Sequence, residues 1–289
     1  MFGALQGRER KRLVAAYAND SHTIGAVNHA IDMGLIEATL VGDEATILDV
    51  CGKEGIDAGK FRIVQEANEG KAAMLAVRLI NEGQGNLLMK GLVSTDKYMR
   101  AILNKEEGLM EKNAVLSHVT VMENANYPKL LTVGDVAIIP LPDFKQKVAI
   151  TNYLIRVAHA LDIERPKVAV IAATELMLHG MVACEEAAML SKMGERGQIK
   201  GAVIDGPLAL DVAIDRHSAQ IKKIGGEVAG DADCLLFPNL EAGNVFYKAN
   251  TKLAGGEQGA IVMGARVPAV LSSRGDSEQT KLYSIALAA

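Results

Sequence analysis

The sequence predicts an α/β protein of two domains, each built on a mostly parallel, helix-covered sheet. Short apolar runs alternate with segments of helical periodicity along most of the 289 residues, and this alternation is typical of βα units. The length accommodates one large or two ordinary domains. The pattern also predicts that the chain leaves the first domain, builds a second and returns, so we expect a ligand-binding cleft between them.

The N-terminal part shows the alternation most clearly. Residues 12–18 form a predicted strand, and the capping residues Asn19, Asp20 and Ser21 precede an apolar helical face that ends near Gly34. Further strands are expected at residues 38–41, 61–64 and 86–89. The helix before the last of these carries an apolar stripe of Met74, Ala76, Leu79 and Ile80.

The pattern changes between residues 115 and 139. Alternating residues are followed by two apolar runs on either side of Gly134-Asp135, which predicts an antiparallel hairpin turning at that dipeptide. Pro140 and Pro142 then end the run, and a long helix to Leu161 follows. We therefore expect domain I to span residues 1–142 plus 262–289, and domain II to span residues 143–261.

The second domain repeats the alternation. Strands are expected at residues 167–173, 201–204 and 233–237, with helices through 187–193, around 212–214 and after Glu241. Gly255, Gly256 and Gly259 separate the last of these helices from a strand at residues 260–263.

Composition excludes several classes of protein. The net charge of −4, the absence of tryptophan and the 4% aromatic content argue against a nucleic-acid surface. No apolar run approaches eighteen residues and the N-terminus lacks a signal-peptide layout, so we expect a cytoplasmic protein that does not bind membranes. Cys51, Cys184 and Cys234 share no C-x-x-C spacing, which favours buried thiols over a disulfide framework or a zinc site.

The C-terminal stretch, residues 267–289, combines a short apolar strand with a helix that carries Leu282, Ile285, Ala286 and Ala289 on one stripe. Ser273-Arg274-Gly275 lies between them. Asp276 or Ser277 can cap the helix, with Gln279 in a box-like position after Asp276. The free amides and dipole of that helix, beside Arg274, predict an anion site; a surface turn with a solvated arginine is the alternative.

Polar residues also follow three other predicted strands. Lys90 and Gly91 end the strand near residue 89, Ser94 or Thr95 can cap the next helix, and Arg100 lies one turn further on. Residues 204–211 place Asp205 and a tight turn after a strand and end at Asp211, and residues 237–244 contain amides and a carboxylate. Ligands collect at the carboxyl ends of such strands, although turns and caps explain the same residues.

Taken together, these motifs resemble the phosphate acyltransferase family of phosphate acetyl- and butyryltransferases. They are M-K-G-x-V-S-T from Met89, L-S-H-V from Leu116, D-G-P-L-A-L-D from Asp205, C-L-L-F-P-N-L-E-A-G-N from Cys234, L-S-S-R-G-D-S from Leu271 and S-I-A-L-A from Ser284. The resemblance covers residue 12 to the C-terminus and is strongest from Gly201. Lys90-Gly91, residues 116–118 and the short chain resemble the butyryl branch more closely.

The resemblance implies a two-domain fold similar to isocitrate and isopropylmalate dehydrogenases. It also implies a reversible reaction in which a short-chain acyl-CoA and phosphate give acyl phosphate and CoA. CoA is then a substrate, no metal or redox cofactor is implied, and a homo-oligomer of at least two chains is expected. Phosphate acetyltransferase and a non-catalytic acyl-CoA sensor are the alternatives. A dehydrogenase is disfavoured because G-x-G-x-x-G does not follow the first strand.

The resemblance further implies roles for single residues. Ser273 would hydrogen-bond the CoA sulfur, and Arg274 with the helix amides would hold phosphate or the developing oxyanion. Substrate-binding residues would be Lys90, Ser94, Thr95, Arg100, Asp211, Asn239, Glu241 and Asn244. The last three would line the cleft or hold the Ser273 loop in place.

One position departs from the family pattern. Where the acetyl branch places an aspartate base, six residues after the arginine, this chain has Thr280. Asp276, the nearest carboxylate in sequence, could replace this base, and Asp211 is a second candidate that folding would have to bring close. The third alternative is that no strong base is needed, because a thiol with a pKa of about 8.5 requires little help to lose its proton. His118 and His217 are expected to be structural.

Overall fold

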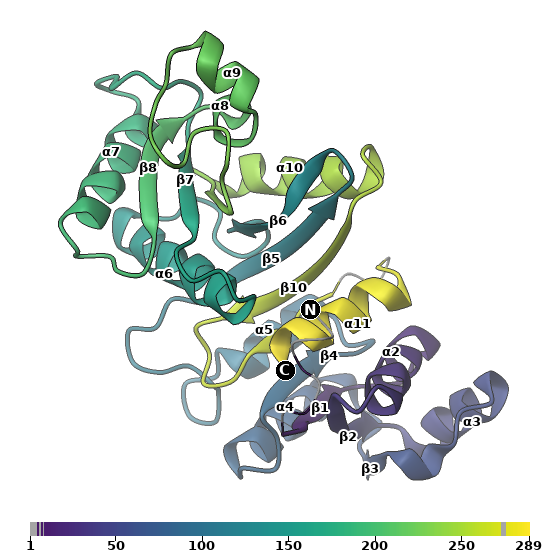
Figure 1. The fold of residues 1–289 in the computed structure, drawn as a ribbon. Coiled ribbons are helices and arrows are strands. Elements are labelled where there is room, and N and C mark those ends of the chain that lie inside the picture. The colour runs from purple at the N-terminus through teal and green to yellow at the C-terminus, as the bar shows by residue number, and fades with distance from the viewer. Residues whose placement is uncertain (1–4, 6, 8, 273–275) are drawn as a thin grey trace. The chain divides into compact units, whose positions relative to one another are not determined.

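The computed structural model describes the chain except residues 1–4, 6, 8 and 273–275. It divides into two compact units, unit 1 (Met1–Leu116 and Gly259–Ala289) and unit 2 (Ser117–Gln258) (Figure 1). The chain passes from unit 1 to unit 2 at Leu116, whereas the sequence prediction, based on Pro140 and Pro142, put the boundary near residue 142. The difference arises because the hairpin after Leu116 packs against the first long helix of unit 2.

The sheet strands of unit 1 follow the order β3-β2-β1-β4-β11-β10, and the first two residues of β10 belong to unit 2. The pairs β1–β2, β1–β4, β2–β3 and β4–β11 are parallel, and β10 is antiparallel to β11. The strands are β1 (Lys11–Ala16), β2 (Ile36–Gly42), β3 (Arg62–Gln65), β4 (Leu87–Lys90), β10 (Glu257–Met263) and β11 (Ala269–Val270). The predicted mostly parallel α/β architecture is confirmed.

The helices of unit 1 begin at side-chain caps that the sequence signals. An Asp, Asn or Ser side chain accepts a hydrogen bond from the backbone N–H three residues on at the start of each α-helix, which satisfies one of its free amides. These helices are α2 (Ser21–Asp32), α3 (Glu44–Glu54), α4 (Glu69–Asn81), α5 (Thr95–Ile102) and α11 (Glu278–Ala288), with a 3₁₀ turn, η1 (Ala58–Lys60), before β3.

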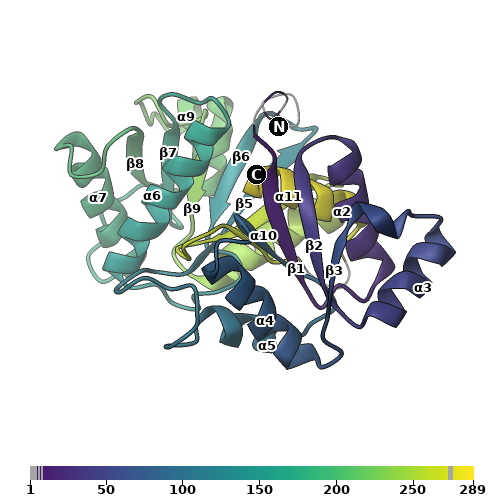
Figure 2. The same ribbon diagram turned by 90° about the horizontal axis from the view of Figure 1, so that it is seen from below.

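The strand order of unit 1 contains a switch of direction. From β1 the chain moves outward through β2 to β3, and then returns to place β4 on the other side of β1. Right-handed crossovers therefore place α2 and α3 on one face and α4 on the other, and α11 packs beside α2 (Figure 2). Ligands of open α/β sheets bind at the carboxyl ends of the strands at such a point, here between β1 and β4.

The sheet strands of unit 2 follow the order β5-β6-β9-β7-β8. β5 and β6 are antiparallel, and β6, β9, β7 and β8 pair in parallel. The strands are β5 (Ser117–Asn124), β6 (Tyr127–Gly134), β7 (Lys167–Ile171), β8 (Val203–Leu208) and β9 (Cys234–Leu236), and the helices are α6 (Phe144–Ala160), α7 (Val182–Glu195), α8 (Leu210–Ile214), α9 (Arg216–Ile221) and α10 (Leu240–Lys252).

Two details of unit 2 correct the sequence prediction. The antiparallel hairpin exists, but its turn follows Asn124, where Asn124 pairs with Tyr127, and Gly134 ends β6 instead of forming the turn. The D-G-P segment lies within β8 and not in a turn after it. Gly206 is required there, because a Cβ would come within 2.8 Å of Val170 on β7, and the β7–β8 register shifts at this point.

The three cysteines are buried and unpaired, as predicted. In the part of the chain that the structure describes, no helix is both long enough and apolar enough to cross a membrane.

Candidate functional site at the carboxyl edge of unit 1

Two loops are tied together where the sheet of unit 1 switches direction. The loop after β4 lies against the loop after β1, because Gly91 N–H donates to Ala16 O over 3.0 Å and Leu92 N–H donates to Tyr17 O over 2.8 Å. Gly91 has no room for a side chain, since a Cβ would lie 2.4 Å from Tyr17 O. The glycine of the M-K-G motif therefore allows two backbone segments to meet at the edge where ligands collect.

Lys90 ends β4 at this edge and is 3% exposed. Its Nζ donates to the carbonyl of Gly91 over 3.2 Å. A buried ammonium is costly unless it meets acceptors or an anion. The structure thus keeps a cation at the switch point, where the sequence predicted one.

Ser94, Thr95 and Arg100 occupy different environments. Ser94 caps α5, and its own N–H donates to Glu69 Oε1 over 2.5 Å. Glu69 also pairs with Lys97, and hydrogen bonding to Lys97 is the main reason that the pKa of Glu69 is lowered. Thr95 is exposed, and Arg100 is an exposed cation paired with Asp96 in its own helix over 3.1 Å.

The start of α11 is described from Asp276 onward. Ser277 is the N-cap, because its Oγ accepts from Thr280 N–H over 3.1 Å. Gln279 therefore does not occupy a box position, and Asp276 lies outside the cap. Thr280, at the position of the expected aspartate, bonds through Oγ1 to Ser277 Oγ. The predicted catalytic residues Ser273 and Arg274 lie outside the described residues.

Sequence reasoning missed a buried charge cluster beside this start. Lys281 is 4% exposed, and its Nζ donates to Ser272 Oγ over 3.2 Å. Burial lowers the pKa of Lys281, and the negative charges of Asp20 and Asp276 oppose that shift. The available signal was the position of Lys281 four residues before Ile285, on the apolar stripe of α11.

Asp20 completes this cluster from the end of the β1 loop. Its Oδ1 caps α2 by accepting from Thr23 N–H over 2.9 Å. Its Oδ2 is buried and has no hydrogen-bond partner among the residues that the structure describes. Leaving a buried carboxylate oxygen without a donor is costly.

The remaining predicted site residues lie in unit 2. Asp211 is exposed at the start of α8, and its hydrogen bond with Lys222 is the main cause of its lowered pKa. Asn239 caps α10, Glu241 is exposed in the first turn, and Asn244 Nδ2 donates to Val136 O over 3.0 Å. The side chains of Asn239 and Asn244 both bond to backbone groups of unit 2.

Asp135 organises the loop that Asn244 contacts. This structural role of Asp135 was not identified from the sequence. Asp135 is 2% exposed. Its two oxygens accept from the backbone N–H groups of residues 137, 138 and 139, and also from Ser117 Oγ and His118 N–H. This carboxylate therefore shapes the carboxyl end of β6.

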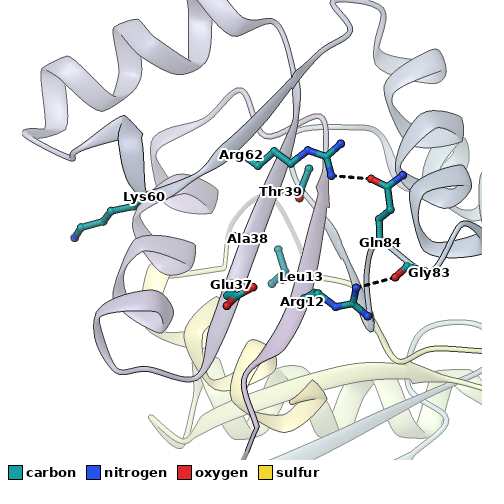
Figure 3. A pocket seen from close by; sticks show the side chains of 9 residues that line it. All are labelled: Arg12, Leu13, Glu37, Ala38, Thr39, Lys60, Arg62, Gly83 and Gln84. Carbon is teal, nitrogen blue, oxygen red and sulfur yellow. Dashed lines mark hydrogen bonds between the residues drawn. The ribbon is translucent and has the colours of Figure 1, made fainter.

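A pocket of about 440 Å³ lies elsewhere in unit 1 (Figure 3). It is formed near the amino ends of β1, β2 and β3, away from the switch-point edge. Its cations already have protein partners: Arg12 donates to Gly83 O over 2.8 Å, Arg62 to Gln84 Oε1 over 2.7 Å, and Lys60, which points away in Figure 3, pairs with Asp32. We therefore place the candidate site at the carboxyl edge. Over the described residues, no group of three or more His, Cys, Asp or Glu side chains could hold a metal ion.

Comparison with known proteins gives the family of the chain. The model of the phosphate acetyl/butaryl transferase family matches residues 52–289. The chain belongs to this family. The resemblance inferred from the motifs is confirmed, and the match includes the candidate edge from Lys90 to α11.

Relatives from both branches of the family align along nearly the whole chain. A phosphate butyryltransferase of Clostridium acetobutylicum is 46% identical, with 99% of this chain and 94% of the relative covered. A phosphate acetyltransferase of Thermotoga maritima is 39% identical, with 96% and 94% covered. Among solved structures, a branched-chain phosphotransacylase from Enterococcus faecalis superposes with a TM-score of 0.83 at 26% identity, with 96% and 97% covered.

Proposed function

We propose that this protein is a phosphate acyltransferase that interconverts a short-chain acyl-CoA and phosphate with acyl phosphate and CoA. The preferred acyl group is butyryl or one of similar length. The observation that carries the proposal is the 46% identity to a phosphate butyryltransferase over 99% of this chain. The switch-point edge, with its buried Lys90 and the amino end of α11, supports it as a place for anionic substrates.

The chemistry is a direct acyl transfer. A phosphate oxygen attacks the thioester carbon, the carbonyl oxygen becomes an oxyanion, and the carbon–sulfur bond then breaks so that CoA leaves as a thiolate and takes a proton. Arg274 and the first free amides of α11 stabilise the oxyanion and orient phosphate, and Ser273 donates to the leaving sulfur. CoA enters as a substrate, and the proposal includes no metal or redox cofactor.

Other residues bind or steer the substrates. Lys90 supplies positive charge at the edge for phosphate, and Ser94 with Thr95 presents the amino end of α5. Arg100, exposed on the same helix, meets an anionic part of CoA. Asn239 and Asn244 act through the loops of unit 2 that they hold, and Glu241 and Asp211 remain exposed there for polar contacts.

Three arrangements would let the CoA thiol lose its proton in the reverse reaction. Asp276 is half-buried beside the cap of α11. Asp211 is paired with Lys222 in unit 2, which weakens it as a base because the pair stabilises the ionised carboxylate. A mechanism without a strong base needs only stabilisation of the thiolate by nearby positive charge.

Release of free thiol tests the activity. The protein is incubated with phosphate and acyl-CoAs of two to six acyl carbons, and thiol is followed with a colorimetric reagent. We expect the fastest release near butyryl-CoA. No release with any chain length would contradict the transferase, and a clear preference for acetyl-CoA would assign the acetyl branch instead. Tight acyl-CoA binding without release would favour the sensor.

The Arg274→Ala variant tests the placement of the oxyanion site. Removing one well-placed donor costs about a hundredfold or more in turnover. The matched control is Arg196→Ala, which removes an exposed arginine at the end of α7 and should leave turnover unchanged. Wild-type turnover in Arg274→Ala would exclude this arginine from the mechanism.

Assembly into a homo-oligomer of at least two chains is part of the same proposal. Sedimentation equilibrium over a range of concentrations measures it directly. A single species of the mass of one chain, 30.7 kDa, would contradict it.

A further inference from the structure

Lys281 is a buried amine on the face of α11 that packs towards α2. Its neighbours on this face, Leu282, Ile285 and Ala286, are apolar and buried. An apolar residue would fill such a position without the cost of burying charge. Burying this lysine therefore lowers the stability of the fold, and the groups around it indicate which role it has.

The helices that carry the cluster are held close together. Gly25 of α2 faces α11 so closely that a Cβ would lie 2.8 Å from Glu278 Cδ. Glu278 in turn pairs with His29 of α2 over 2.9 Å. This contact fixes the first turn of α11 against α2, and it leaves Lys281 within the field of Asp20, the cap of α2.

The groups that act on Lys281 come from three segments. Its ammonium donates to Ser272 Oγ, two residues after β11. The negative charges of Asp20, in the loop before α2, and Asp276, the residue before the cap of α11, act on it electrostatically. The Glu278–His29 pair lies on the same two helices, one turn away along α11.

Stability alone does not explain this buried cluster of charges. Replacing a buried ionic cluster by apolar residues is often neutral or stabilising. One carboxylate oxygen of Asp20 has no hydrogen-bond partner among the described residues. The hydrogen bond from the Lys281 ammonium reaches Ser272, two residues after β11.

We propose that Lys281 is a positioning residue for the transferase reaction: its buried ammonium donates to Ser272 Oγ and so fixes Ser272, which follows β11, against α11 at the switch-point edge. The inference rests on the proposed function. It assigns a role to a residue directly after Thr280, the position where the acetyl branch carries its aspartate. The charged form of Lys281 does this work, because only the ammonium attracts both carboxylates.

The consequence is a pH dependence with a defined sign. Burial lowers the pKa of Lys281 from its ordinary value, so the ammonium is lost at a lower pH than that of an exposed lysine. Turnover in the thiol-releasing direction should then fall on the alkaline side as Lys281 loses its proton. An arginine at this position stays charged over the whole range.

Lys281→Met and Lys281→Arg test the proposal together, with kcat and KM measured from pH 6 to pH 10. Loss of the ammonium should lower kcat about tenfold to a hundredfold, since small misplacements cost that much. The unfolding midpoint in urea should be equal to wild type or higher. Lys281→Arg should restore most of kcat and move the alkaline decline to higher pH. Lys53→Met, which removes an exposed lysine of α3, is the matched control.

Asp20→Asn keeps the test decisive if arginine does not fit the buried position. Asparagine is an equally good N-cap, so α2 keeps its start while Lys281 loses one carboxylate. The alkaline decline should then move to lower pH. Wild-type kcat and an unchanged profile in Lys281→Met, or an unmoved decline in Asp20→Asn, would overturn the inference while leaving the transferase intact. A wild-type protein that releases no thiol would overturn both.

Discussion

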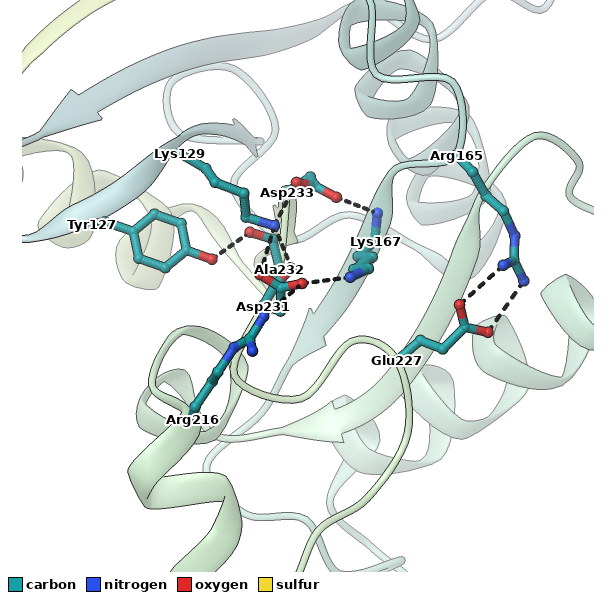
Figure 4. A network of polar contacts seen from close by, with 9 residues as sticks. All are labelled: Tyr127, Lys129, Arg165, Lys167, Arg216, Glu227, Asp231, Ala232 and Asp233. Carbon is teal, nitrogen blue, oxygen red and sulfur yellow. Dashed lines mark hydrogen bonds and ion pairs between the residues drawn. The ribbon is translucent and has the colours of Figure 1, made fainter.

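Two clusters of lysine and aspartate in this protein differ in the segments that they join. In unit 2, Lys129 bonds Asp233 over 2.7 Å and Asp231 over 3.1 Å, and Lys167 and Arg216 also contact Asp231 (Figure 4). Lys167 N–H donates to Asp233 Oδ2 over 2.8 Å. Each carboxylate of this network has cationic or amide donors, and together they join β6, β7 and β9.

In unit 1, the Lys281 ammonium donates to the hydroxyl of Ser272 over 3.2 Å, and the negative charges of Asp20 and Asp276 act on it electrostatically. One oxygen of Asp20 has no hydrogen-bond partner in the described part of the chain. The comparison indicates that the unit 2 network joins strands within the sheet, whereas the unit 1 cluster lies between α11 and the segment after β11, at the edge where substrates are proposed to bind. Ionisable groups with perturbed pKa values are often found at functional sites.

The largest effect is expected for Gly91→Ala, which disturbs the switch-point edge of unit 1 without changing any charged residue. A Cβ at Gly91 would meet the backbone of residues 16 and 17. We expect stability to fall by about 1–3 kcal/mol and kcat to fall about tenfold or more. Gly52→Ala in α3, where a Cβ meets nothing within 4 Å, should be neutral or stabilising. Urea unfolding and thiol release measure both, and full activity in Gly91→Ala would refute the close approach.

Asp231→Asn should affect stability and not activity. It leaves Lys129 and Lys167 without a shared carboxylate, at a cost of about 2 kcal/mol for a partly buried group. Asp49→Asn, in an exposed pair with Lys53, should cost less than about 0.5 kcal/mol. Unfolding in urea gives both values. A large loss of kcat in folded Asp231→Asn would mean that the unit 2 network is functional as well.

The dependence of stability on acid pH tests the role of Asp231 in a second way. Burial acts to raise the pKa of Asp231, but hydrogen bonds and charge from Lys167 and Lys129 outweigh it and lower that pKa to about 2. Because the pKa of Asp231 is lower in the folded than in the unfolded protein, its ionised form stabilises the fold at pH values above the unfolded-state pKa. This stabilisation, no more than about 2 kcal/mol, is lost as the pH falls from about 4 to about 2. The stability difference between wild type and Asp231→Asn should therefore shrink over this range. A difference that stays constant would disprove the linkage.

Arg100→Ala is expected to have the smallest effect on stability. The Arg100–Asp96 pair is largely exposed, and such pairs contribute less than about 1 kcal/mol. If Arg100 meets CoA, KM for acyl-CoA should rise severalfold while the unfolding midpoint stays unchanged. Asp96→Asn keeps the cation and should leave KM unchanged. An unaltered KM in Arg100→Ala would remove this residue from the binding set.

Local features of the fold were largely predictable. The first strand was expected at residues 12–18 and is Lys11–Ala16, and Asp20 and Asn239 were identified in segments with capping chemistry. The hairpin turn was misplaced, because Gly134-Asp135 has turn composition. Its aspartate instead accepts hydrogen bonds from the loop that follows, and pairing between β5 and β6 decides where the turn lies.

The candidate site was only partly predictable. Lys90, Gly91 and Ser94 stand in one short motif, so their presence at one strand end could be inferred. Lys281 could not, since its meaning depends on Asp20 and Ser272. Asp276 was a candidate cap, and the structure gives that role to Ser277. A choice between adjacent capping residues depends on backbone angles that composition does not specify.

By itself the sequence determined the alternation of strands and helices, most helix caps and the motifs that place the chain in its family. These depend on periodicity and on hydrogen bonds between residues a few positions apart. Only the tertiary structure decided that β4 returns beside β1, and that the charge of Asp20, near one end of the chain, acts on Lys281, near the other. Such contacts follow from packing of α11 against α2, which no local pattern encodes.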